Sequence, residues 1–290
     1  MSARRWFRFV ILAIVLKAFA VYPAAASESK PPFDTKALIH FDQTNGTTTL
    51  ISDESQHYPW NVTNTSDYVT THTKKFGTGS FNSSNTTVGY LSTPWDKDLV
   101  AINNNFTLDF WINMTSNPGA ASGWSIPFYI MDSSSNGYYL MYDKSAGNYR
   151  LEFYIRRAGV TSTYSYTSAS PILTTGTWTH VAAVLNDTSV NVFVGGNRVA
   201  NGTYSSDYSP VSSSGNAWIG GHTNGLYVTN RYIDEFRLIN GKALWGSTNF
   251  TPPSAADTSE PDYLVTADSS YTTTNVTQSF CVIGGGGGTH

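Results

Sequence analysis

Apolar and polar residues alternate in short runs along most of the chain, from Lys36 to Pro253. The clearest run is Asn105 to Asn113, in which every second residue is large and apolar: Phe106, Leu108, Phe110 and Ile112. The run from Tyr149 to Arg156 has the same period of two. Because successive side chains of a strand point to opposite faces, this period predicts strands with one face in a core and the other partly in water.

Further runs of β-forming residues predict more strands. They are Ala37 to Asp42, Phe76 to Phe81, Val88 to Leu91, Ile126 to Met131, Gly137 to Tyr142, Thr177 to Leu185, Val190 to Val194, Arg198 to Ala200, Asn216 to Gly220 and Arg231 to Leu238. Turn dipeptides such as Asn136-Gly137 and Gly196-Asn197 allow the positive φ of tight hairpins. Only Lys242 to Trp245 suggests a helical turn. The pattern predicts an all-β fold, one sandwich of two antiparallel sheets.

The two ends of the chain differ from this pattern. Basic residues up to Arg8, an apolar run from Phe9 to Val21 and three small residues ending at Ala26 predict a secretory signal peptide, residues 1–26. The apolar run is interrupted by Lys17 and is shorter than the roughly 20 residues of a spanning helix, which favours cleavage over a retained anchor. Residues 27–35 are expected to be a short linker, 36–253 the domain, and 254–290 a Ser/Thr/Gly-rich tail.

The charge of the mature chain argues against several partners. Loss of the signal peptide removes four basic and no acidic residues, leaving 13 basic and 20 acidic side chains and a formal charge of −7. Nucleic acids and anionic lipids both need a basic face, so neither is expected as a partner. Cys281 is the only cysteine, so no disulfide forms within the chain; it is either incidental or an intermolecular bridge, and a homo-oligomer is possible.

The N-glycosylation motif Asn-x-Ser/Thr occurs more often than composition predicts. About five copies are expected by chance from the frequencies of Asn, Ser and Thr. Eleven are present, at Asn45, Asn61, Asn64, Asn82, Asn85, Asn105, Asn113, Asn186, Asn201, Asn249 and Asn275. The excess indicates a secreted glycoprotein; the alternative is that an Asn- and Thr-rich β protein forms the motif by accident.

Several segments, in this order, resemble the laminin-G-like (concanavalin A-like) jelly-roll family. They are Ala37–Asp42, Lys75–Phe81, Tyr90–Thr93, Phe106–Ile112, Gly176–Ala182, Val192–Gly196, Trp218–Gly221, Tyr232–Arg237 and Asn249–Pro253. The resemblance implies two curved antiparallel sheets packed face to face, with the concave face and the rim loops open to ligands. It implies no particular ligand, because the family includes carbohydrate binders, adhesion modules and hydrolases.

Asp234 and Asp42 are the acidic residues with the clearest candidate role. If Phe236 and Leu238 point inward, Asp234 shares their parity and approaches the core, where a lone carboxylate is costly. The resemblance suggests Ca²⁺ at the rim of the sandwich, bound by Asp234, Asp42 and backbone carbonyls. The alternative is a carboxylate that accepts hydrogen bonds from backbone amides.

Catalysis is not expected. Acidic pairs with the spacing of a glycosidase occur only at Asp96/Asp98 and Glu260/Asp262, outside convincing strands. The histidines lack the spacing of a zinc site, and His180 is expected to be a hydrogen-bonded strand residue. A polysaccharide hydrolase is therefore the minor alternative, and it would need turnover that disappears when Asp96 or Asp98 is changed.

Aromatic residues offer a binding surface instead, since their rings stack on the apolar faces of sugars. The candidates are Trp60, Trp95, Trp111, Trp124, Tyr138, Tyr142 and Tyr154, of which Trp124, Tyr138 and Tyr154 are expected to contact a ligand. The leading hypothesis is a secreted or surface-associated adhesion module, not an enzyme, that binds a glycan or a surface protein. The alternative is a structural subunit of a virion, appendage or extracellular sheath.

Overall fold

A computed structural model describes residues 35–257, except residue 65 and the segments 84–88, 97–98, 100–104, 119–123, 158, 205–213 and 223–229. The predicted signal peptide, nearly all of the linker, most of the tail with Cys281, and the residues Asp98, Asn85 and Asn275 lie outside the described residues. Within the described ranges, no helix is long and apolar enough to span a bilayer. The expected boundaries of the signal peptide, domain and tail stay predictions.

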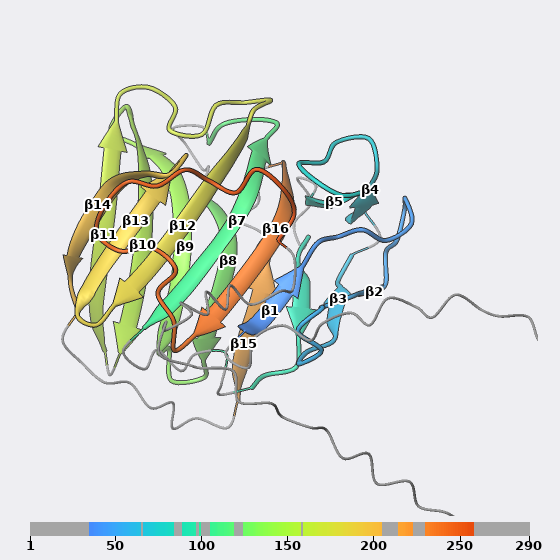
Figure 1. Cartoon of the computed structure of the whole chain (residues 1–290), viewed down its shortest axis with the longest axis horizontal. Helices are drawn as coiled ribbons and strands as arrows, with labels where there is room; N and C mark the ends of the chain where they lie inside the picture. Colours follow the sequence, from blue (N-terminus) through green and yellow to red (C-terminus); the bar gives the residue numbers. More distant parts are fainter. Residues whose placement is uncertain are drawn as a thin grey trace, which may run out of the picture.

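The described strands form two antiparallel sheets, as the sequence predicted (Figure 1). Sheet A runs in the order β14 (Asn197–Thr203), β13 (Ser189–Val194), β12 (Trp178–Asn186), β7 (Phe106–Met114), β16 (Arg231–Asn240), β5 (Ser80–Ser83) and β4 (Tyr68–Thr70), and β1 (Thr35–Ile39) also pairs with β16. Sheet B runs in the order β11 (Val160–Ser168), β10 (Asn148–Arg157), β9 (Gly137–Ser145), β8 (Ser125–Asp132), β15 (Gly215–Ile219), β6 (Leu91–Thr93), β3 (Trp60–Val62) and β2 (Leu50–Ile51).

The apolar core lies between the two sheets and confirms the alternation predicted for β7. The four apolar residues of that strand belong to one buried cluster, to which sheet B contributes Phe128, Leu140 and Phe153. The ring of Phe110 lies 6.2 Å from Phe128 and 6.1 Å from Phe236 of β16. Strands with this pattern fold as a sandwich because each sheet has one apolar face, which is removed from water only against another apolar layer.

The outer face of sheet A is also covered, which corrects the prediction of a partly wet face on β7. All nine residues of β7 are buried. Residues 241–257, the orange-red segment after β16 in Figure 1, cross this face. Trp245 and Phe250 of this segment pack against a small apolar cluster that includes Ala182 and Phe193. His180 of β12 lies under this segment and bonds Asp109 through its Nε2 atom at 3.1 Å, as expected for a hydrogen-bonded strand residue.

The structure differs from several local predictions. Residues 76–79 form a loop, and only Ser80 begins the strand expected from Phe76. Residues 242–245 are irregular, without the helical turn that was expected; the Trp245 ring instead stacks on Phe250 at 4.0 Å. The whole of β11 was missed, because its Ser, Thr and Tyr residues give little apolar alternation.

Candidate functional site

Four aromatic side chains form a row across the outer face of sheet B, the face turned away from sheet A. Tyr154 of β10 is in register with Tyr139 of β9, Tyr139 with Tyr129 of β8, and Tyr129 with Trp218 of β15. They lie on the outer face because Tyr138, Phe128 and Phe153, one position away, point into the core. We call Tyr154, Tyr139, Tyr129 and Trp218 the aromatic row.

Neighbouring rings of the aromatic row are in contact: the pairs Tyr154–Tyr139 and Tyr129–Trp218 are stacked, and the middle pair is tilted by 34°. Their centroids are 4.5 Å apart between Tyr154 and Tyr139, 5.7 Å between Tyr139 and Tyr129, and 5.0 Å between Tyr129 and Trp218. Cross-strand neighbours are about 4.5–5.5 Å apart, which suits such stacking. Each ring therefore covers part of its neighbour's face, so the row offers ring edges more than open ring faces.

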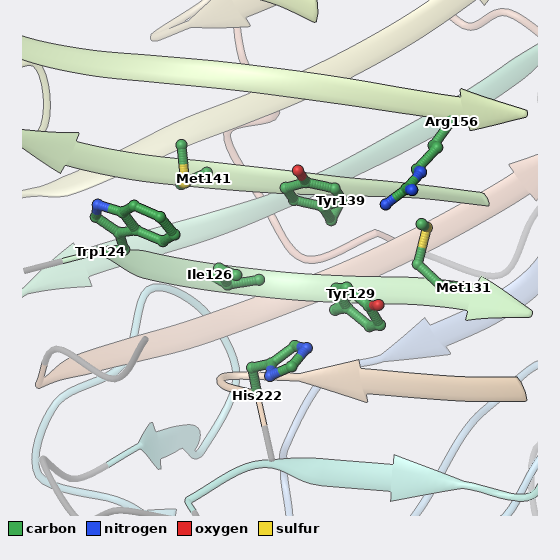
Figure 2. A pocket seen from close by; sticks show the side chains of 8 residues that line it. All are labelled: Trp124, Ile126, Tyr129, Met131, Tyr139, Met141, Arg156 and His222. Atoms are coloured by element: carbon green, nitrogen blue, oxygen red, sulfur yellow. The ribbon is translucent and has the colours of Figure 1, made fainter. Parts of the chain in front are cut away.

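A shallow hollow of about 150 Å³ lies along β8 and β9 and crosses this row (Figure 2). Its lining residues are Trp124, Ile126, Tyr129, Met131, Tyr139, Met141, Arg156 and His222. Trp124 lies at one end, next to Met141, and is 44% exposed. This exposure makes its indole better placed than the stacked row to receive the face of another ring.

The other end of the hollow depends on a glycine. Gly137 of β9 is in register with Arg156 on one side and Met131 on the other. A Cβ at this position would lie 2.1 Å from the carbonyl oxygen of Ile130, so only glycine fits. Because β9 has no side chain here, Arg156 reaches from β10 over β9 towards the ring of Tyr139 (Figure 2).

Beside the hollow, the acidic side chains on β9 and β10 are already bonded. Asp143 accepts hydrogen bonds from Nε and Nη2 of Arg150, at 2.9 and 2.5 Å. Glu152 accepts hydrogen bonds from the Tyr154 hydroxyl at 2.7 Å and from Ser165 Oγ at 2.9 Å. Burial and the Glu152 carboxylate raise the pKa of the Tyr154 hydroxyl, so it stays a donor. The bond to Glu152 fixes Tyr154 at the end of the row.

Of the three residues expected to contact a ligand, two lie at or beside the hollow and one lies in the core. Trp124 lines the hollow and Tyr154 ends the row beside it. Tyr138 is removed from the set, because it is 1% exposed, packs in the core and donates its hydroxyl to the Leu99 carbonyl at 2.5 Å. The sequence reasoning missed Tyr129 and Tyr139, the two residues in the middle of the hollow.

Asp234 is buried, but on the opposite face of sheet A from the one expected. A bulge between Asp234 and Arg237, with Glu235 at φ +52°, reverses the alternation of β16. Ile233 and Phe236 therefore face the core, while Asp234 lies on the outer parity of sheet A, in register with Trp111. The loop of residues 75–79 covers it, and Lys75 Nζ lies 3.9 Å from the Trp111 ring centroid.

Backbone amides of that loop bind both acidic residues proposed as metal ligands. Asp234 Oδ2 accepts from the N–H groups of Lys75 at 2.7 Å and Phe76 at 3.2 Å, and its Oδ1 from Glu235 at 2.9 Å. Asp42 Oδ1 accepts from the N–H groups of Thr78 and, at 3.1 Å, Gly79. These bonds match the alternative expectation of carboxylates that accept hydrogen bonds from backbone amides. Among the described residues no group of three or more potential metal-ligating side chains occurs, and Ca²⁺ at this rim stays a prediction.

The predicted glycosylation sites differ in exposure. Among the described residues, the asparagines of five motifs are exposed: Asn45, Asn61, Asn186, Asn201 and Asn249. Asn64, Asn82 and Asn105 are half-buried. Asn113 is a correction, because it is 6% exposed within β7, between Trp178 and Tyr232 in register, and has no room for a glycan.

Comparison with known proteins finds solved structures with a similar fold. Similar solved structures include the binding domain of botulinum neurotoxin serotype D (15% identity, TM-score 0.51, 73% of this chain and 49% of that chain). Others are the binding domain of Paraclostridial Mosquitocidal Protein 1 (12%, 0.51, 73% and 50%) and that of Botulinum Neurotoxin DC in complex with SialylT (11%, 0.51, 73% and 49%). The chain spans about half the length of these structures, and the likeness shows the fold.

The family follows from the sequence itself. No curated protein matches the chain. A family model described as the concanavalin A-like lectin/glucanases superfamily matches residues 63–245, more than half of the chain and most of both sheets. The predicted resemblance is thus confirmed: this two-sheet sandwich belongs to the concanavalin A-like lectin/glucanases superfamily.

Proposed function

We propose that the protein is an extracellular glycan-binding module, and that its ligand lies in the hollow on the outer face of sheet B. The observation that carries this proposal is the aromatic lining, with the exposed indole of Trp124 at one end and Tyr129 and Tyr139 in the middle. Sugar rings have apolar faces that stack on indole, and hydroxyl groups that bond polar side chains. The signal-peptide pattern of residues 1–26 supports a location outside the cell.

The shape of the hollow favours a short oligosaccharide over a single enclosed ring. Met141, next to Trp124, and Gly137, opposite Arg156, are four residues apart on β9, or about 14 Å at the rise of an antiparallel strand. A volume of about 150 Å³ is small, whereas pockets that enclose a whole ligand measure roughly 300–1,000 Å³. The ligand would therefore lie along the strands and stay partly in water.

We also propose binding without hydrolysis. A glycosidase of the usual kind needs two carboxyl groups at the scissile bond. No described residue that lines the hollow is a carboxylate, and the nearby acids Asp143 and Glu152 are bonded to Arg150, Tyr154 and Ser165. The solved binding domain in complex with SialylT has a similar fold, which supports sugar recognition on this kind of sandwich.

Replacing Trp124 with alanine is expected to weaken glycan binding about tenfold, because the ligand loses its stacking partner. A glycan array identifies the ligand, and calorimetric titration then compares the native protein with the variant. Leu50→Ala is the matched control, since Leu50 is 54% exposed and lies on β2 at the far edge of sheet B. Equal affinity of native protein and Trp124→Ala, or an equal loss in Leu50→Ala, would contradict the proposal.

A further inference from the structure

Arg156 is the charged side chain of the hollow, and its surroundings differ from those of Arg150 on the same strand. Arg150 is paired with Asp143 at 2.5 Å and lies 3.7 Å from Glu152. Arg156 is exposed and forms no hydrogen bond or ion pair with any residue that the structure describes. Because both acids on this part of the face are already bonded, the guanidinium of Arg156 is available to a ligand.

The backbone holds this guanidinium over the hollow. Its register partners are Gly137 on β9 and Thr161 on β11. Gly137 has no side chain, so the space above it on the outer face is left to Arg156. Met131 of β8 lies on one side of this space, and Tyr139 of β9 lies next to it along the strand (Figure 2). The guanidinium therefore lies at the end of the hollow opposite Trp124 and next to the ring of Tyr139.

We propose that the glycan in the hollow carries a carboxylate, as uronic and sialic acids do, and that Arg156 binds this carboxylate. The inference rests on the glycan-binding function proposed above and names the class of sugar. The planar guanidinium presents parallel N–H donors that match the two oxygens of a carboxylate, which a neutral sugar lacks. One sugar ring of the ligand stacks on Trp124, and an acidic sugar farther along the oligosaccharide reaches Arg156.

The acidic composition of the chain does not oppose this assignment. The formal charge, −3 for the full chain and −7 without residues 1–26, is spread over the whole molecule, and charges more than about 8–10 Å away are screened at physiological salt. Within the hollow the nearest formal charge is that of Arg156, because no described lining residue is acidic. The acids beside the hollow, Asp143 and Glu152, are bonded to Arg150, Tyr154 and Ser165, so the charge of Arg156 dominates at its end of the hollow.

The test is a calorimetric titration with sialyllactose and a galacturonate oligomer, each beside its carboxyl-reduced, neutral counterpart. Native protein is expected to bind at least one acidic probe about fivefold to tenfold more tightly than its neutral counterpart, the range for an exposed charge-assisted pair. Arg156→Gln is expected to remove this difference while it keeps the affinity for the neutral probe. Arg156→Lys, which keeps the charge but loses the fork, should retain only part of it.

Arg157→Gln is the matched control. Arg157 is the next residue of β10, so its side chain leaves the opposite face of the sheet. This variant should keep the full preference for the acidic probe. An equal loss in Arg157→Gln and Arg156→Gln, or equal binding of acidic and neutral probes by native protein, overturns the inference and leaves the glycan-binding proposal standing. If native protein binds neither these probes nor any glycan of an array, both proposals fail.

Discussion

Replacement of Asp109 with alanine is expected to lower the free energy of unfolding by about 3 kcal/mol, because it removes the shared partner of a partly buried guanidinium, Arg237, and a buried imidazole, His180. Asp109 is 3% exposed, on β7. Its carboxylate receives Arg237 Nε at 2.9 Å, Arg237 Nη2 at 3.0 Å and His180 Nε2 at 3.1 Å. Burial by itself would raise the pKa of Asp109, but the charge of Arg237 and the contacts with His180 lower it.

Asp257→Ala is the matched control for this prediction. Asp257 is the second carboxylate on the same guanidinium, paired with Arg237 Nη1, and its side chain is 31% exposed. A partly exposed pair contributes less than about 1 kcal/mol, so this variant should be nearly as stable as native protein. Urea unfolding followed by tryptophan fluorescence measures both. A loss in Asp109→Ala no larger than in Asp257→Ala would show that the Asp109 contacts do not stabilise the fold.

The sandwich could be predicted from the sequence because its central strands alternate strongly. In β7 the apolar residues Phe106, Leu108 and Phe110 occupy every second position, and the structure places all three in the core. In β9 the same reasoning fails, since Tyr138, Tyr139, Leu140 and Met141 are all apolar or aromatic. Such a run does not reveal which face points inward. This ambiguity explains why the sequence predicts Tyr138, and not Tyr139, as a ligand contact.

The candidate site depends on register, which a single strand does not contain. Tyr154, Tyr139, Tyr129 and Trp218 become neighbours only through the pairing of four strands. The turn between β8 and β9 helps to set this pairing: Asp132 Oδ1 accepts from the N–H groups of Ser134 and Asn136 at 2.9 and 2.8 Å. The prediction that Asp234 faces the core is wrong for a related reason. The bulge at Glu235 shifts the alternation of β16, and no local sequence pattern indicates this bulge.

A pH-dependent contribution to stability is expected from His40, which follows the end of β1. Its Nδ1 atom lies 2.7 Å from Glu235 Oε2 of β16, and its Nε2 atom 3.2 Å from Glu54 Oε2. Burial would lower the pKa of His40, but the hydrogen bond and charge of Glu235, with the charges of Glu54 and Asp42, outweigh it and raise the pKa from 6.5 to about 9. The folded protein therefore binds this proton more tightly than the unfolded chain does.

The sign of the effect follows from that difference. The stabilisation is present in full below pH 6.5, the ordinary value, and is lost as the pH rises through about 9. The shift corresponds to about 3 kcal/mol. Asp234, next to Glu235, acts in the same direction over a lower window: burial raises its pKa from 3.8 to about 8, so its charge costs stability as the pH rises towards 8.

His40→Gln separates the two contributions, because glutamine keeps a polar side chain but does not titrate. Native protein should lose about 3 kcal/mol more than this variant between pH 6 and pH 9.5, measured by urea unfolding at half-unit steps. The two proteins should differ most at pH 6 and approach each other above pH 9. If the difference between them stays constant across this range, the proton on His40 does not link β1 to β16, and the contact is a hydrogen bond without a net charge effect.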